Sequence, residues 1–93
     1  MTEFMGNISG TYDAKEKGFG PGASSLHSCM TGHGPEAEVF EKASTANLQP
    51  SKTPQDSLAF MFETCYMLKM TDYAMHDARL DKDYKKCWDS IKP

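Results

Sequence analysis

The alternation of hydrophobic and polar residues is clearest between residues 58 and 70. One side of this segment is rich in apolar and aromatic residues and consists of Leu58, Phe60, Phe62, Thr64, Tyr66, Leu68 and Met70. A period of two with many aromatic residues is typical of a β-strand. The pattern predicts one long strand, or two adjoining strands, with Phe60 and Phe62 facing a core. A single strand cannot bury its own face, so its partners must come from the first third of the chain or from polypeptide outside it.

Residues 36–46 have the spacing of a short helix. Pro35 suits the first helical position, acidic residues follow it in the first turn, and one face carries Val39, Phe40 and Ala43. The next residues, 47–56, contain Pro50 and Pro54 and are expected to form a linker.

Residues 81–91 return to helical spacing. Asp81 can cap this segment, and its apolar stripe consists of Tyr84, Cys87, Trp88 and Ile91. We expect Tyr84 and Trp88 to lie in the core. Residues 58–91 are therefore predicted to form a strand followed by a terminal helix.

The first third of the chain differs from the rest in its glycine content. All seven glycines lie between Gly6 and Gly34. Glycine is favoured where the backbone needs a positive φ or a close approach. Residues 1–35 are therefore predicted to be loop-rich, with a turn or ordered loop over residues 18–25, and Glu3 is expected at a frayed terminus.

Composition narrows the class of protein. A chain of 93 residues is expected to form one domain, and a net charge of −3 argues against binding to nucleic acid. No apolar run approaches the roughly 20 residues of a membrane span, and no secretory signal is visible at the first residues. The odd number of cysteines, Cys29, Cys65 and Cys87, argues against a disulfide framework. We therefore expect a cytoplasmic protein with reduced thiols.

Two histidines within seven residues, His27 and His33, lie on a glycine-bounded segment and leave several kinds of site open. Together with Cys29 they could bind zinc, although the spacing is uncommon and a fourth ligand is missing. Cys29 could pair with a histidine as a nucleophile, and residues 18–22 could hold a phosphate, although Pro21 removes one donor. A non-haem iron site of imidazole and carboxylate is the remaining alternative, for which Glu3 is one of thirteen carboxylates.

Several motifs, in order along nearly the whole chain, resemble one enzyme family. They are EFMG at 3–6, YDAK at 12–15, GASSLHSCMTGHGP at 22–35, FEKAS at 40–44, AFMFE at 59–63 and KCW at 86–88. Together they resemble the C-terminal part of the homogentisate 1,2-dioxygenases. The resemblance is loosest between Cys65 and Arg79.

The resemblance implies a fold and an activity. The fold would be mainly β with short helices, a partial cupin-like β-sandwich (jelly roll) truncated at its N-terminus. Residues 1–93 would be the C-terminal portion of the catalytic domain, with the glycine-rich site loops in 1–35. The complete enzyme would use Fe(II) and O2 to open the ring of homogentisate to maleylacetoacetate in phenylalanine and tyrosine catabolism, as a homo-oligomer.

The resemblance also implies roles for particular residues. Glu3 and His33 would be iron ligands, Tyr12 and His33 would contact the substrate, and His27 would be a second-sphere histidine that donates to substrate or oxygen. The family's first histidine ligand, which precedes the glutamate by a few residues, is absent from this chain. We therefore expect the isolated chain to be inactive, and a non-catalytic remnant or small interaction module remains the alternative function.

Overall fold

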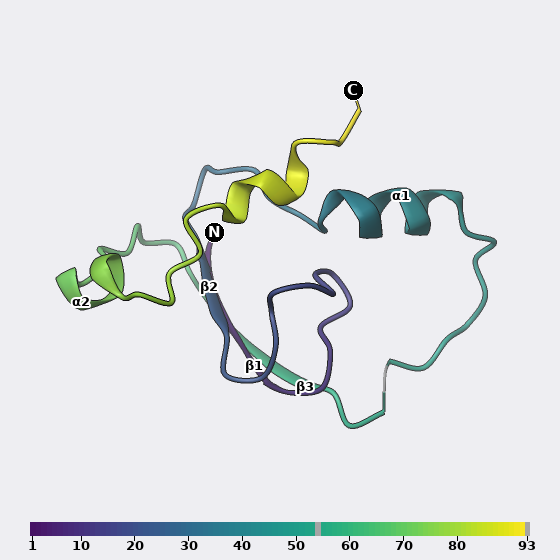
Figure 1. Cartoon of the computed structure of the whole chain (residues 1–93), viewed down its shortest axis with the longest axis horizontal. Helices are drawn as coiled ribbons and strands as arrows, with labels where there is room; N and C mark the ends of the chain where they lie inside the picture. The colour runs from purple at the N-terminus through teal and green to yellow at the C-terminus, as the bar shows by residue number, and fades with distance from the viewer. Residues whose placement is uncertain (54, 93) are drawn as a thin grey trace.

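A computed structural model describes residues 1–53 and 55–92 and contains one sheet and three short helical segments (Figure 1). The elements in chain order are β1 (Thr2–Ser9), β2 (Ser24–His27), α1 (Ala37–Thr45), β3 (Leu58–Thr64), α2 (Asp72–His76) and the 3-10 helix η1 (Tyr84–Trp88). This inventory is consistent with the expected mainly β fold with short helices. No helix in the described part of the chain is long and apolar enough to cross a membrane.

The sheet has three antiparallel strands in the order β2-β1-β3, so the strand nearest the N-terminus is the central one. The expectation of a frayed start was wrong. Thr2 is fully buried, its hydroxyl donates to the carbonyl of Tyr66 at 2.7 Å, and it accepts from the backbone N–H of Cys29 at 3.0 Å. These two bonds anchor the beginning of β1 to the ends of both neighbouring strands.

The strand predicted over residues 58–70 ends earlier, at Thr64. Its partner is β1, with the pairing of Thr2 opposite Thr64 at the edge of the ladder. The partner therefore comes from the first third of the chain, which was one of the two sources expected from the pattern.

The two faces of the sheet differ in what covers them. On one face Met5 and Asn7 are buried, and the loop between β1 and β2 packs there with Phe19, which is 6% exposed. The Asn7 side chain amide donates to the carbonyls of Gly10 and Phe19, both at 2.9 Å, and thereby fixes this loop against the sheet. The glycine-rich segment is thus an ordered cover over one face.

The opposite face carries an aromatic group that was expected to be core. The Phe4 and Phe60 rings are 5.9 Å apart and the Phe60 and Phe62 rings 5.4 Å apart. Phe62 is nevertheless 68% exposed, so the prediction that it faces a core was wrong for the described residues. The reason is that the 10–20 loop and η1 cover the other face. The radius of gyration, 14.4 Å, exceeds the roughly 12 Å of a compact chain of this length.

The helical predictions were correct in place but not in extent. Helix α1 covers 37–45 of the predicted 36–46, and its cap is Glu36, so Pro35 lies just outside it. The predicted helix over 81–91 is one 3-10 segment, Tyr84–Trp88. The carboxylate of Asp81 accepts from the N–H of Asp83 and does not cap this segment. Helix α2 was not predicted.

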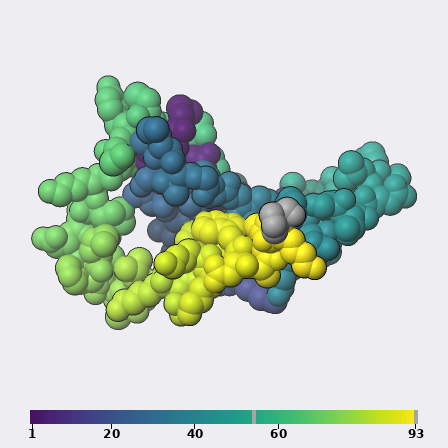
Figure 2. Space-filling view, turned by 90° about the horizontal axis from the view of Figure 1, so that it is seen from above, coloured from purple at the N-terminus to yellow at the C-terminus, as the bar shows by residue number. Residues whose placement is uncertain are grey.

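The C-terminal segment lies against the loop that follows β2. The indole N–H of Trp88 donates to the carbonyls of Gly34 and Pro35 at 3.0 and 3.1 Å. In the space-filling view the C-terminal segment packs over the segment around residue 30 (Figure 2). The 3-10 helix η1 therefore helps to cover the same face of the sheet as the glycine-rich loop.

Replacing Thr2 with Val should destabilise the fold. The methyl group fits the buried space, but the carbonyl of Tyr66 and the N–H of Cys29 lose their partner, which costs about 1–3 kcal/mol in unfolding free energy. Chemical denaturation measures it. The control is Thr53→Val at an exposed position, for which a change within about 0.5 kcal/mol is expected. Equal effects of the two substitutions would show that Thr2 does not anchor the sheet.

Candidate metal centre

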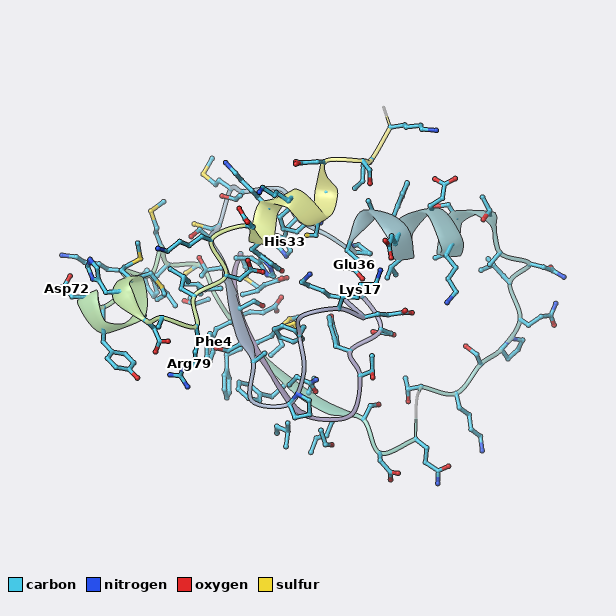
Figure 3. The ribbon with its side chains drawn as sticks, in the orientation of Figure 1. Phe4, Lys17, His33, Glu36, Asp72 and Arg79 are labelled. Atoms are coloured by element: carbon cyan, nitrogen blue, oxygen red, sulfur yellow. The ribbon has the colours of Figure 1, made fainter. Side chains whose placement is uncertain are left out.

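Three side chains from separate parts of the chain meet on the covered face of the sheet. Glu3 lies on β1, and His27, the last residue of β2, is its cross-strand partner. His33 comes from the loop between β2 and α1, which returns over the same face (Figure 3). The antiparallel register sets the first pair, and the loop adds the third side chain.

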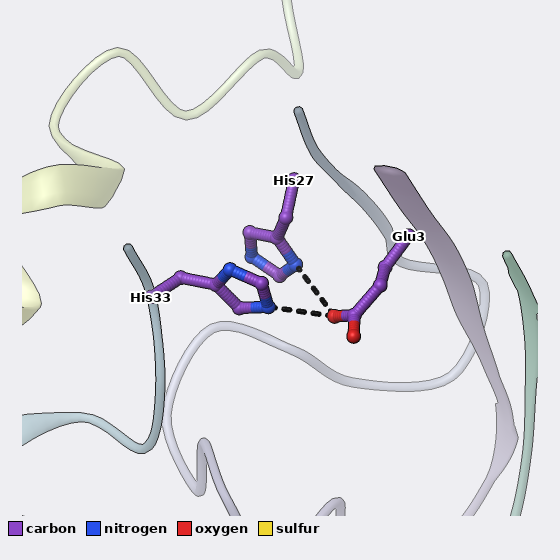
Figure 4. A group of neighbouring side chains, drawn as sticks. All are labelled: Glu3, His27 and His33. Atoms are coloured by element: carbon purple, nitrogen blue, oxygen red, sulfur yellow. Dashed lines mark hydrogen bonds and ion pairs between the residues drawn. The ribbon is translucent and has the colours of Figure 1, made fainter. Parts of the chain in front are cut away.

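The carboxylate of Glu3 is the point on which both imidazoles converge (Figure 4). His33 Nε2 lies 2.6 Å from Glu3 Oε2, and His27 Nδ1 lies 3.9 Å from the same oxygen. The two imidazole rings stack at a centroid distance of 4.0 Å with an interplanar angle of 10°. One ligand atom from each of the three residues lies within 4.8 Å of the others.

The three side chains are shielded without being fully buried. The side chain of His27 is 12% exposed, and those of Glu3 and His33 are each 24% exposed. The hydrogen bond from His33 holds the pKa of the Glu3 carboxyl below its ordinary value. Burial, followed by the proximity of His33, lowers the pKa of His27. These pKa shifts favour an ionised carboxylate beside a neutral His27, which then has one ring nitrogen that donates and one that accepts.

A cavity of about 310 Å³ opens onto this cluster. Tyr12 lines it and packs against Phe19 at a ring distance of 5.6 Å. Burial raises the pKa of Tyr12, so its phenol stays protonated and can donate a hydrogen bond into the cavity. Tyr12 is thus in the same pocket as the three convergent side chains, although no spacing in the sequence places it there.

The chemistry of the donor set fits a divalent transition metal. Two imidazole nitrogens and one carboxylate oxygen on one side of an ion form the donor set of non-haem Fe(II) sites, with positions left open for other ligands. Cys29 is not in the group of metal-ligand side chains in the described chain, which disfavours the zinc site of His27, Cys29 and His33. Glu3 and His33 lie in direct contact, and their role as metal ligands stays a prediction.

The phosphate alternative for residues 18–22 loses a second donor in the structure. The N–H of Gly22 donates to the carbonyl of Asn7 at 2.8 Å, which holds the loop to the sheet, and Pro21 has no N–H.

Sequence reasoning missed the contribution of the C-terminal helix to the pocket. Tyr84 and Trp88 were expected in a core, whereas both line the cavity. Lys15 and Glu36, which also line it, form an ion pair at 3.4 Å with side chains 14% and 9% exposed. The stripe on residues 84–88 was the available signal, but it does not distinguish a pocket wall from a core.

Comparisons with known proteins cover nearly the whole chain. A family model described as homogentisate 1,2-dioxygenase C-terminal matches residues 1–93. A curated homogentisate 1,2-dioxygenase of Dictyostelium discoideum is 52% identical over 92 residues, which cover 99% of this chain and 21% of the relative. The chain thus spans about a fifth of the length of the curated relative that it matches.

The stability of the fold should fall as pH is lowered. The folded state holds the pKa of His27 below its ordinary 6.5 and that of Glu3 below 4.5, so the unfolded chain binds protons at a higher pH than the folded chain. The loss begins below about pH 6.5 through His27 and continues below about pH 4.5 through Glu3.

His27→Gln should flatten the upper part of this dependence and leave the part below about pH 4.5. Thermal unfolding between pH 4 and 7.5 measures it, with His76→Gln as the matched loss of an imidazole outside the cavity. An unchanged slope near pH 6 in His27→Gln would contradict the account of His27.

Proposed function

We propose that this chain, which belongs to the homogentisate 1,2-dioxygenase C-terminal family, is the C-terminal portion of the catalytic domain of a ring-cleaving dioxygenase. The observation that carries the proposal is the contact of His33 Nε2 with Glu3 Oε2 at 2.6 Å. A carboxylate and an imidazole 30 residues apart meet in a cavity, next to a second imidazole.

Glu3 and His33 would hold the iron, with a further histidine from polypeptide outside this chain. When bound, Fe(II) would bring substrate and O2 together at its open positions and supply the electron transfer that ring cleavage requires. The substrate proposed is homogentisate and the product maleylacetoacetate. The complete domain would be a cupin-like β-sandwich to which this sheet contributes three strands.

The residues of the chain itself bind and orient the substrate. The protonated phenol of Tyr12 can donate a hydrogen bond to a polar group of homogentisate, and the exposed part of the His33 ring can contact the aromatic ring. His27 lies next to the carboxylate and can donate to a substrate or oxygen atom from Nδ1. The cavity, about 310 Å³, lies at the lower end of the range for small-molecule sites.

The sheet removes part of the cost of assembling this site. Closing a loop of 30 residues in a flexible chain costs on the order of 3 kcal/mol. Because Glu3 lies in the central strand and His27 opposite it, folding of the sheet brings two of the three side chains together. The proposed third iron ligand, a histidine from outside this chain, is still missing from the donor set. We therefore expect the 93 residues alone to bind Fe(II) weakly.

The alternative is a non-catalytic interaction module. The observation that favours it is the aromatic face on which Phe4 and Phe62 are exposed beside the half-buried Phe60, because exposed apolar patches are typical of binding surfaces. A cytoplasmic location and assembly into a homo-oligomer accompany the enzyme proposal. The free thiols of Cys29, Cys65 and Cys87 support a reducing compartment.

Glu3→Gln is the sharpest test of the enzyme proposal. In a polypeptide of the relative's full length that ends in this chain, the change should lower the iron content and reduce homogentisate-dependent O2 uptake by at least about 10–100-fold, because a metal-bound carboxylate is lost. Glu63→Gln is the matched control, since Glu63 is the other cross-strand neighbour of Glu3 and is exposed. Full activity and iron content in Glu3→Gln would contradict the proposal.

The isolated chain should bind Fe(II) weakly or not at all and cleave no homogentisate. Metal analysis after desalting and an oxygen electrode measure this. Iron near one per chain, with O2 uptake on addition of homogentisate, would contradict the need for a histidine from outside the chain. If the chain instead captured a defined protein through its aromatic face, and Phe62→Ser abolished that capture, the module would be favoured.

A further inference from the structure

The 3-10 helix η1 contacts both segments that carry the histidines. The hydroxyl of Tyr84 lies 2.9 Å from His27 Nε2, across 57 residues of sequence. One turn later, Trp88 donates to the carbonyls of Gly34 and Pro35, directly after His33. The Tyr84 and Trp88 rings pack edge to face at 5.3 Å, so the two contacts belong to one unit.

Tyr84 is itself held in place. The Lys15 ammonium lies 5.5 Å from the centre of the Tyr84 ring, within the range of a cation–π contact, and is paired with Glu36. The Tyr84 side chain is thus fixed on one side by a cation and bonded on the other to His27. A phenol held in this way can select one state of the imidazole that it touches.

His27 presents its two ring nitrogens to different partners. Nδ1 faces the Glu3 carboxylate at 3.9 Å, whereas Nε2 faces the Tyr84 hydroxyl. A neutral imidazole has one N–H donor and one acceptor nitrogen, and the hydrogen bond at one nitrogen decides the state of the other. Two arrangements are possible, and they give His27 different roles.

In the first arrangement Nε2 carries the proton and donates to the oxygen of Tyr84. The lone pair of Nδ1 then points at the negative carboxylate of Glu3, which is repulsive, but Nδ1 is free to bind a metal. In the second arrangement the Tyr84 hydroxyl donates to Nε2. Nδ1 then carries the proton and directs an N–H dipole toward the carboxylate, which is attractive. The second arrangement is the one that satisfies both neighbours.

We propose that Tyr84 is a positioning residue whose hydroxyl donates to Nε2 of His27 and fixes the imidazole in its Nδ1–H form. His27 then offers the cavity a hydrogen-bond donor in place of a metal-binding lone pair. The role of His27 as donor to a bound substrate or oxygen rests on the proposed function, whereas the tautomer does not. Tyr84 thereby determines that, of three convergent donors, Glu3 and His33 bind metal and His27 does not.

The test is the ring 15N spectrum of His27 in the metal-free chain. The chain has three histidines, so labelling histidine alone gives three sets of signals, assigned by His33→Gln and His76→Gln. We expect a protonated Nδ1 and an acceptor Nε2 for His27 in the wild type. Tyr84→Phe should lose this single pattern and shift His27 toward a protonated Nε2, whereas Tyr66→Phe, at a residue 73% exposed, should leave it unchanged.

Three results would overturn the proposal. They are a wild-type His27 protonated at Nε2, an even mixture of both forms in the wild type, or an unchanged Nδ1–H form in a folded Tyr84→Phe chain. If the Tyr84→Phe chain does not fold, as judged by loss of the native amide spectrum, the spectrum of the wild-type chain is the test. A Tyr84 hydroxyl proton correlated with Nε2 of His27 supports the proposal, and an N–H at Nε2 contradicts it. If the 93-residue chain lacks native dispersion, the same labels are placed in the full-length polypeptide.

The spectrum separates this proposal from the enzyme proposal. It is recorded without iron or homogentisate, so a protein that failed to cleave homogentisate would still show the tautomer set by Tyr84. Conversely, a His27 protonated at Nε2 would contradict the role of Tyr84 and would leave the proposed ligand roles of Glu3 and His33 intact.

Discussion

The whole site depends on the position of β1 in the centre of the sheet. A central strand has a neighbour on each side, so β1, which carries Glu3, is held by its pairing with β2 and β3 and by the buried hydroxyl of Thr2 at the start of the strand. The register then places His27 opposite Glu3 without any further device. His33 completes the cluster because six residues of loop after β2 bring the chain back over the same face.

The two faces of the sheet differ in what lies against them. The glycine-rich loop and the C-terminal 3-10 helix converge over Glu3, where Phe19 is buried and Tyr84 and Trp88 form a wall of the cavity. Aromatic and apolar side chains thus wall the cavity around the three polar donors. On the other face Phe4 and Phe62 are exposed and Phe60 is half-buried.

The sequence predicted the elements whose pattern follows from one periodicity. The alternation of residues 58–70 predicted β3, although the strand ends at Thr64, and helical spacing predicted α1 within one residue at each end. The sequence did not predict β1, because the covered face of that strand carries Glu3 and Asn7. These two polar residues interrupt the apolar alternation, since Glu3 belongs to the site and the Asn7 side chain binds the loop. The sequence did not predict β2 either, because four residues are too few for a periodic pattern.

For the site, the family resemblance singled out Glu3, His33, Tyr12 and His27, and the structure brings all four to one cavity. Spacing could not have done this, since Glu3 and His33 are 30 residues apart and join through strand pairing and a loop. The bond between His27 and Tyr84 was beyond any sequence pattern, because it links residues 57 positions apart across a turn of 3-10 helix that reads as an ordinary amphipathic segment.

The central claim is that the carboxylate of Glu3 and Nε2 of His33 hold one metal ion. Crystals of the full-length polypeptide grown with Fe(II) and measured at the iron absorption edge test it most directly. We predict one anomalous peak in contact with both Glu3 and His33, with His27 beside the ion and outside its ligand set. An iron peak with no contact to Glu3, or none on this face of the sheet, would contradict the account.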